Sequence, residues 1–135
     1  MARTGMIQEL PSFGLWQCTA LRDLNVDMCG LQYYVHTDRN RPRRIIEGVT
    51  TILLADFWPR PQAGPTDLTL TIDLDSALEL SCMVSRSFAD VVLPYLDRGL
   101  SAVRLLKGHG TLDASDRAAV AEILEPLQRR GALVL

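Results

Sequence analysis

The chain has 135 residues, of which 47% are hydrophobic and 22% are charged, and its formal net charge at neutral pH is −2. This composition is typical of a soluble globular protein. No apolar run approaches the roughly 18 residues that a membrane-spanning helix needs. The first residues also lack the apolar core of a signal peptide. We therefore expect a cytoplasmic protein that has no membrane partner.

The three cysteines, Cys18, Cys29 and Cys82, are unevenly spaced and odd in number. Such a pattern favours reduced thiols over a disulfide framework. The mildly acidic charge argues against DNA binding, because affinity for DNA comes largely from neutralising phosphates. Arginines do cluster in residues 37–44, TDRNRPRR, and we interpret them as a solvated hairpin tip. We expect no nucleic-acid partner.

The first part of the chain reads as strands. Residues 15–20 (LWQCTA), 31–36 (LQYYVH) and 50–58 (TTILLADFW) are apolar and rich in aromatic or β-branched side chains. Turn-forming residues between the last two segments favour a hairpin.

A break follows at Pro59 to Thr66, where PRPQAGPT contains three prolines and one glycine. This composition excludes the interior of a helix or strand. We place a domain boundary here, with residues 1–66 as a β-rich N-terminal extension and residues 67–135 as a compact module. The extension could add strands to the sheet of the module or dock a partner enzyme.

Two further strands are predicted after this break. In residues 67–74, DLTLTIDL, apolar and polar side chains alternate with the period of two that a half-buried strand requires. Residues 77–84, ALELSCMV, continue that period. Asp75 and Ser76 would form the turn of an antiparallel hairpin.

Three short helices are then expected. The first begins near Ser87, carries an apolar stripe, and is kinked or cut short by Pro94 before Gly99 stops it. Residues 101–108, SAVRLLKG, predict the second. The third begins at Asp113 or Ser115, bends at Pro126 and ends at Gly131, followed by the apolar segment ALVL. The expected helical core consists of Phe88, Val92, Leu96, Leu105, Ile123 and Leu127.

Antiparallel strands followed by three short helices give an α+β, winged-helix-like fold. Residues 87–106 and 116–135 resemble the helical half of the precursor-peptide recognition domains of ribosomally made, modified peptides, of which the small chaperone of the pyrroloquinoline quinone pathway is an example. The resemblance covers about Asp67 to Leu135. The two helical prolines and the long N-terminal extension depart from the pattern of that family.

The resemblance implies that the leader of a precursor peptide adds as a strand to the sheet edge, beside the third helix. In this chain the matching strand is Leu78 to Val84 and the matching helix is Asp116 to Arg130. Main-chain groups of an exposed edge give such a complex its affinity, and side-chain pockets give it specificity. The peptide-binding residues would be Leu78, Leu80, Cys82, Arg117, Val120 and Leu124.

Catalysis has little support in the sequence. The two histidines are His36 and His109, and His109 lies in a glycine-flanked loop that suggests a solvent-facing role. His36 and Asp38 could form a metal pair, but Cys18 and Cys29 lack the close spacing of a zinc site. We therefore expect no catalytic residue, no metal ligand and no cofactor.

The expected function is that of a non-catalytic accessory protein. It would bind the leader of a precursor peptide and present it to a partner modifying enzyme, such as a metal-dependent oxidase. The alternative is a winged-helix transcription regulator. Glu122 and Glu125 on the third helix disfavour that alternative because they would repel phosphate. A winged-helix subdomain that serves assembly alone is a third possibility.

Overall fold

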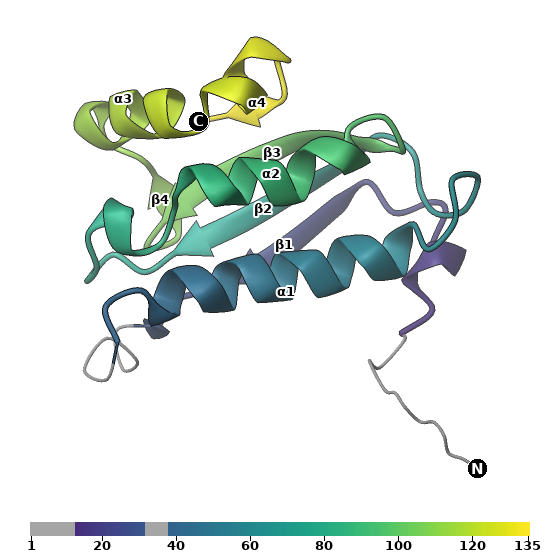
Figure 1. Ribbon diagram of the computed structural model, residues 1–135, viewed down its shortest axis with the longest axis horizontal. Coiled ribbons are helices and arrows are strands. Elements are labelled where there is room, and N and C mark those ends of the chain that lie inside the picture. The colour runs from purple at the N-terminus through teal and green to yellow at the C-terminus, as the bar shows by residue number, and fades with distance from the viewer. Residues whose placement is uncertain (1–12, 32–37) are drawn as a thin grey trace.

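The computed structural model describes residues 13–31 and 38–135, in which strands and helices alternate along the chain (Figure 1). The helices are α1 (Arg41–Phe57), α2 (Arg86–Val92), α3 (Ala114–Ile123) and α4 (Glu125–Arg129). The strands are β1 (Asp23–Asp27), β2 (Leu68–Leu74), β3 (Leu100–Lys107), β4 (Gly110–Thr111) and β5 (Leu133–Val134). Short 3-10 turns are η1 (Leu15–Gln17), η3 (Leu80–Cys82) and η4 (Leu93–Tyr95).

The sheet is built around β2, which pairs in parallel with β1 on one side and with β3 on the other. The free edge of β3 carries two short strands, β5 in parallel and β4 antiparallel. Parallel neighbours need a crossover, and α1 and α2 supply the two that are required. The carboxyl ends of β1, β2 and β3 therefore meet at one edge of the sheet.

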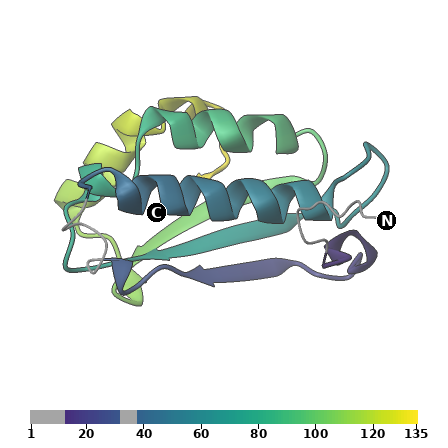
Figure 2. The same ribbon diagram turned by 60° about the horizontal axis from the view of Figure 1, so that its bottom comes forward.

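The helices cover one face of this sheet, and in the described part of the chain no helix lies on the other face (Figure 2). Alternate side chains of β2 form the centre of the core under the helices. Leu68, Leu70, Ile72 and Leu74 are all 0% exposed and share one cluster with residues of α1 and α2. The molecule thus has two layers, with a single core between sheet and helices.

The remaining side chains of the three parallel strands face the uncovered side, which we call the open face. Strand register arranges them in three rows across β1, β2 and β3. The rows are Asp23–Thr69–Ala102, Asn25–Thr71–Arg104 and Asp27–Asp73–Leu106. The last row lies nearest the carboxyl edge of the sheet.

Helix α1 replaces the hairpin and the strand that the sequence predicted over residues 37–58. Three of its buried residues, Ile46, Thr50 and Leu54, recur every four residues, which is the spacing of one helical face. Thr50 donates its hydroxyl hydrogen to the backbone oxygen of Ile46 at 2.7 Å, so this polar side chain can lie in the core. Burial of this face overrides the strand preference of the β-branched side chains.

The predicted winged-helix-like fold is wrong. Residues 67–74 do form a strand, but residues 77–84 form a turn and η3 instead of the second arm of a hairpin. Residues 101–108, predicted as a helix, lie in β3, and residues 15–20, predicted as a strand, contain η1. Strands are interleaved with helices, so the N-terminal antiparallel sheet of the prediction does not exist. The predicted strand over 31–36 lies almost entirely outside the described residues.

The helix ends near prolines are predicted correctly. Helix α2 is short and passes into η4 at Pro94, and α3 gives way to α4 just before Pro126. The carboxylate of Asp113 caps α3 by accepting a hydrogen bond from the backbone N–H of Asp116 at 2.7 Å. Of the predicted core, four side chains are buried, and Leu96 and Ile123 are partly buried against it. The buried four are Phe88, Val92, Leu105 and Leu127.

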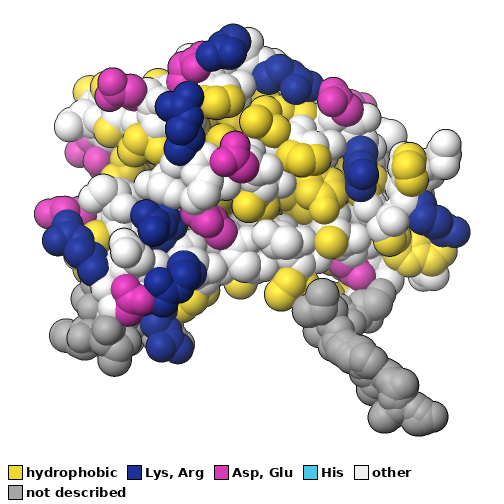
Figure 3. Space-filling view, viewed as in Figure 1, with side chains coloured by type: hydrophobic (Ala, Val, Ile, Leu, Met, Phe, Trp, Pro, Cys, Tyr) yellow, Lys and Arg dark blue, Asp and Glu magenta, His cyan; other side chains and the backbone are white. Residues whose placement is uncertain are grey.

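The helical face shows no patch of a single charge. Figure 3 shows basic and acidic side chains interspersed with apolar ones over this face. Among the described residues, no helix has both the length and the apolar character needed to cross a bilayer.

The loop from Pro59 to Thr66 is fastened to the end of α1 by Trp58. This side chain is 1% exposed, and its Nε1 donates a hydrogen bond to the backbone oxygen of Pro65 at 3.0 Å. Gly64 passes so close that a Cβ atom there would lie 2.1 Å from the backbone oxygen of Phe57. The φ of Gly64 is +90°, a value that favours glycine.

Gly64→Ala should therefore destabilise the fold, by at least about 2 kcal/mol, because left-handed strain adds to a backbone collision. The free energy of unfolding from urea denaturation measures the effect. Gly48→Ala in α1 is the control, since a Cβ there meets nothing within 4 Å and should stabilise the helix by about 0.5–1 kcal/mol. Equal stability of Gly64→Ala and the unsubstituted protein would contradict this account of the loop.

Candidate functional site

Four potential metal ligands gather where the parallel strands end. Asp27 is the last residue of β1, Cys29 follows two residues later, Asp73 lies near the end of β2, and His109 follows β3. One ligand atom of each side chain lies within 4.8 Å of those of the others. The convergence depends on topology, because parallel strands bring their carboxyl ends to the same edge.

Strand pairing positions Asp27 and Asp73, and a tight turn positions His109. Asp27 and Asp73 are register partners across β1 and β2. His109 lies in the two-residue turn between β3 and β4, where Gly108 and His109 have φ values of 59° and 68°. Two consecutive left-handed residues are typical of a type I′ hairpin turn. A histidine in this region is uncommon and strained, and such strain is often found at functional sites.

The carboxylate of Asp73 holds His109 at two points. Oδ1 accepts the backbone N–H of His109 at 2.8 Å, and Oδ2 pairs with the ring nitrogen Nδ1. The Asp73 side chain is 13% exposed, whereas that of His109 is 69% exposed. Since a carboxylate can only accept, Nδ1 carries the proton in this contact, and Nε2 is the ring nitrogen left to meet a ligand. Nε2 lies 4.0 Å from Sγ of Cys29.

Backbone contacts fix the loop that carries Cys29. The backbone N–H of Cys29 donates to Oδ1 of Asp27 at 2.9 Å, and this hydrogen bond lowers the pKa of the Asp27 carboxyl. The buried Asp75 carboxylate accepts the N–H of Gly30 at 2.9 Å and that of Ala77 at 2.8 Å. The thiol is thus placed by the same strand ends as the two carboxylates.

The surroundings of Cys29 disfavour a free thiolate. Desolvation, a hydrogen bond to Asp27 and the charges of Asp73, Asp27 and Asp75 raise the pKa of the thiol to about 11. A negative potential of this kind attracts a cation, and a bound metal ion would deprotonate a coordinating thiol.

The order Cys29, His109, Asp73 also matches nucleophile, base and orienting group in a catalytic triad. A nucleophilic cysteine needs a lowered pKa, which cationic neighbours usually provide. Here the neighbours are carboxylates and the pKa is raised. The arrangement therefore suits metal coordination better than nucleophilic catalysis.

The cluster opens onto a hollow of about 470 Å³ on the open face. The hollow extends from the carboxyl edge to the middle row of the sheet. Its lining combines charged, amide, hydroxyl and apolar groups, as small-molecule sites usually do. The lining residues are Asn25, Val26, Asp27, Thr71, Asp73, Arg104, Leu106 and His109.

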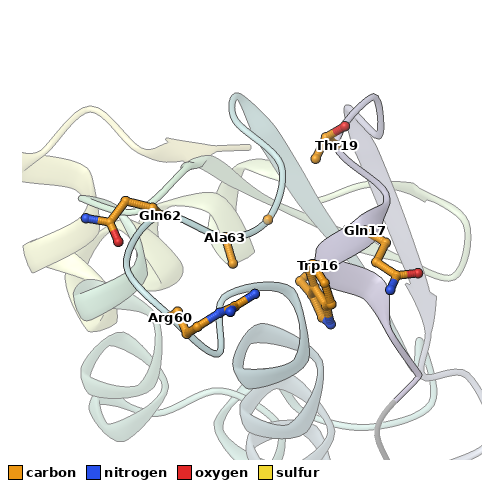
Figure 4. Close-up of a pocket in the computed structure, with 7 residues that line it drawn as sticks. Trp16, Gln17, Thr19, Arg60, Gln62 and Ala63 are labelled. Carbon is orange, nitrogen blue, oxygen red and sulfur yellow. The ribbon is translucent and has the colours of Figure 1, made fainter.

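A larger hollow, of about 550 Å³, lies at the opposite edge of the sheet, between η1 and the loop after α1 (Figure 4). Arg60 and Trp16 face each other across it, with the guanidinium carbon 5.1 Å from the centre of the indole ring. Its other lining residues are Gln17, Thr19, Gln62, Ala63 and Gly64. This lining contains no Asp, Glu, His or Cys, so the smaller hollow is the better candidate for chemistry.

The peptide-binding residues predicted from the sequence lie mostly in the core. Arg117 is exposed, and its guanidinium donates to the backbone oxygen of Leu112 at 3.0 Å. The predicted edge strand over Leu78 to Val84 is absent, so the basis for strand addition there is lost. Binding of a leader peptide stays a prediction. The buried members are Leu78, Leu80, Cys82, Val120 and Leu124, with 9%, 7%, 6%, 0% and 0% exposure.

Sequence reasoning missed the cluster because it compared cysteines and histidines with local zinc motifs. By these motifs Cys29 is paired with Cys18, and the flanking glycines of His109 predict a solvent-facing loop residue. Asp38, once considered with His36, pairs with Arg44, and His36 lies outside the described residues. A signal was available in the sequence. Asp27 and Asp73 lie at or near the ends of two strands, and His109 follows a third. A parallel-sheet prediction would have brought these three strand ends together.

Comparison of the chain with protein-family models, with curated proteins and with solved structures finds no match. Function therefore has to be inferred from the chemistry of the site.

Proposed function

We propose that this protein binds a divalent transition-metal ion, with zinc as the best fit, through Asp27, Cys29 and Nε2 of His109. The observation that supports the proposal is the convergence of a carboxylate, a thiol and an imidazole from two chain segments, the end of β1 and the turn after β3, within 4.8 Å. Asp73 would orient the imidazole through Nδ1, the role that carboxylates usually have beside metal-bound histidines.

The ligand types favour zinc over calcium or magnesium. Sulfur and nitrogen ligands suit zinc, whereas the harder cations prefer oxygen alone. Zinc–sulfur and zinc–nitrogen bonds of about 2.3 and 2.0 Å imply a separation of about 3.5 Å between the two ligand atoms in a tetrahedral site. The 4.0 Å between Sγ of Cys29 and Nε2 of His109 is close to that value. A small side-chain adjustment would close the site.

Three protein ligands would leave one coordination position open toward the hollow on the open face. This arrangement is typical of catalytic zinc, whereas structural zinc usually has four protein ligands. A zinc ion in such a site lowers the pKa of bound water to about 7 and supplies a hydroxide at neutral pH. We therefore propose metal-dependent hydrolysis of a small molecule as the function of the site.

Loss of a ligand should weaken metal binding specifically. Cys29→Ser and His109→Gln should each lower zinc affinity by at least about tenfold, and Asp73→Asn by about 10–100-fold through loss of ring orientation. Isothermal titration of the metal-free protein with zinc measures the effect. Cys18→Ser is the matched control because Cys18 is an exposed thiol outside the cluster. Unchanged affinity in Cys29→Ser would refute the site.

The thiol provides an independent check on the metal-free protein. Because the pKa of Cys29 is raised to about 11, iodoacetamide should alkylate it slowly at pH 8 and faster as the pH approaches that value. Zinc should protect Cys29 and leave Cys18 reactive. Mass spectrometry of the separate peptides gives both rates. Rapid alkylation of Cys29 at pH 7 would instead favour the nucleophilic triad.

A further inference from the structure

We infer that the ligand of the proposed metal site is a short carboxylic acid. Arg104 binds its carboxylate group, and the other end of the ligand reaches the metal. The inference rests on the proposed function, because the second end of the ligand is held by the metal. It adds a substrate class and a residue that determines specificity.

Strand register places Arg104 at the right distance from the cluster. Arg104 is the register partner of Thr71, and Thr71 is that of Asn25, so the three form the middle row of the open face. The row of Asp27 and Asp73 lies two residues further along the strands. Two residues of a strand span about 7 Å, which a ligand with a few bonds between its two polar ends can bridge.

The guanidinium of Arg104 has no hydrogen bond or ion pair with any described residue, and the side chain is exposed. Other arginines are engaged, such as Arg129 with Glu125 and Arg130 with Asp97. Among the described residues that line the hollow, Arg104 is the one lysine or arginine. A planar guanidinium binds carboxylates with two parallel hydrogen bonds.

The charge of the cluster decides whether the ligand carries a carboxylate or a phosphate. Arg104 supplies one positive charge, whereas Asp27 and Asp73 lie at the other end of the same hollow. With a divalent metal and the Cys29 thiolate counted, the cluster keeps about one net negative charge, so a phosphate dianion would meet more repulsion there than a carboxylate monoanion would. Asn25 and Thr71 add uncharged hydrogen-bonding groups beside Arg104. The hollow therefore favours a singly charged carboxylate.

The test uses the full chain loaded with cobalt, whose visible absorption reports ligand binding, and thiols as probes of the open position. Mercaptopropionate carries a carboxylate, mercaptopropanol is its neutral analogue, and mercaptoethylphosphonate carries the dianion. Mercaptopropionate should bind at least about tenfold more tightly than mercaptopropanol, as a charge-assisted pair would give. Arg104→Met should abolish that preference while leaving the affinity for cobalt and for mercaptopropanol unchanged.

Two further variants keep the test specific. Arg104→Lys retains the charge and should keep part of the preference, whereas Arg86→Met removes an exposed arginine of α2 and should change nothing. Equal binding of the acid and the alcohol, or a preference that survives Arg104→Met, would overturn the inference and leave the metal site intact. Tighter binding of the phosphonate would overturn the choice of carboxylate. Failure of the protein to bind cobalt would refute the metal site and this inference together.

Discussion

Parallel pairing of β2 with both β1 and β3 is the constraint on which the rest of the structure depends. It requires two crossovers, and α1 and α2 supply them on the same face of the sheet. The apolar side chains of β2 are buried beneath these helices, while the alternate side chains remain on the open face. The same pairing brings the ends of three strands together, and in open parallel sheets ligands bind at the carboxyl ends of the strands.

The chemistry of the site follows from this arrangement. Asp27 and Asp73 come together as register partners, and the tight turn after β3 folds His109 back onto Asp73. No single segment of the chain contains the site, and each of its side chains is exposed or half-buried. The resulting cluster places carboxylates around a thiol. Their negative charge disfavours a thiolate and favours a bound cation. Arg104 lines the same hollow from the middle row of the open face.

Local sequence patterns predicted some elements well and the topology poorly. The alternation in residues 67–74 identified β2, and the prolines at 94 and 126 located the ends of α2 and α3. Helix α1 was missed because Ile46, Thr50 and Leu54 form its buried stripe within a run of β-branched residues, whose local preference is for strands. Strand β3 was missed because a short apolar segment such as SAVRLLKG has no periodicity that separates a strand from a helix. With the crossover helix α1 and the strand β3 misassigned, the parallel sheet could not be predicted, and neither could the meeting of Asp27, Cys29, Asp73 and His109.

The most direct test of the account is X-ray absorption spectroscopy of the zinc-loaded protein, because it identifies the atoms bound to the metal. The account predicts one sulfur at about 2.3 Å and light nitrogen or oxygen ligands at about 2.0–2.2 Å, in a four-coordinate site. The sulfur signal should disappear in Cys29→Ser and persist in Cys18→Ser. A shell made of oxygen and nitrogen alone in the unsubstituted protein, or a sulfur signal that survives Cys29→Ser, would contradict it.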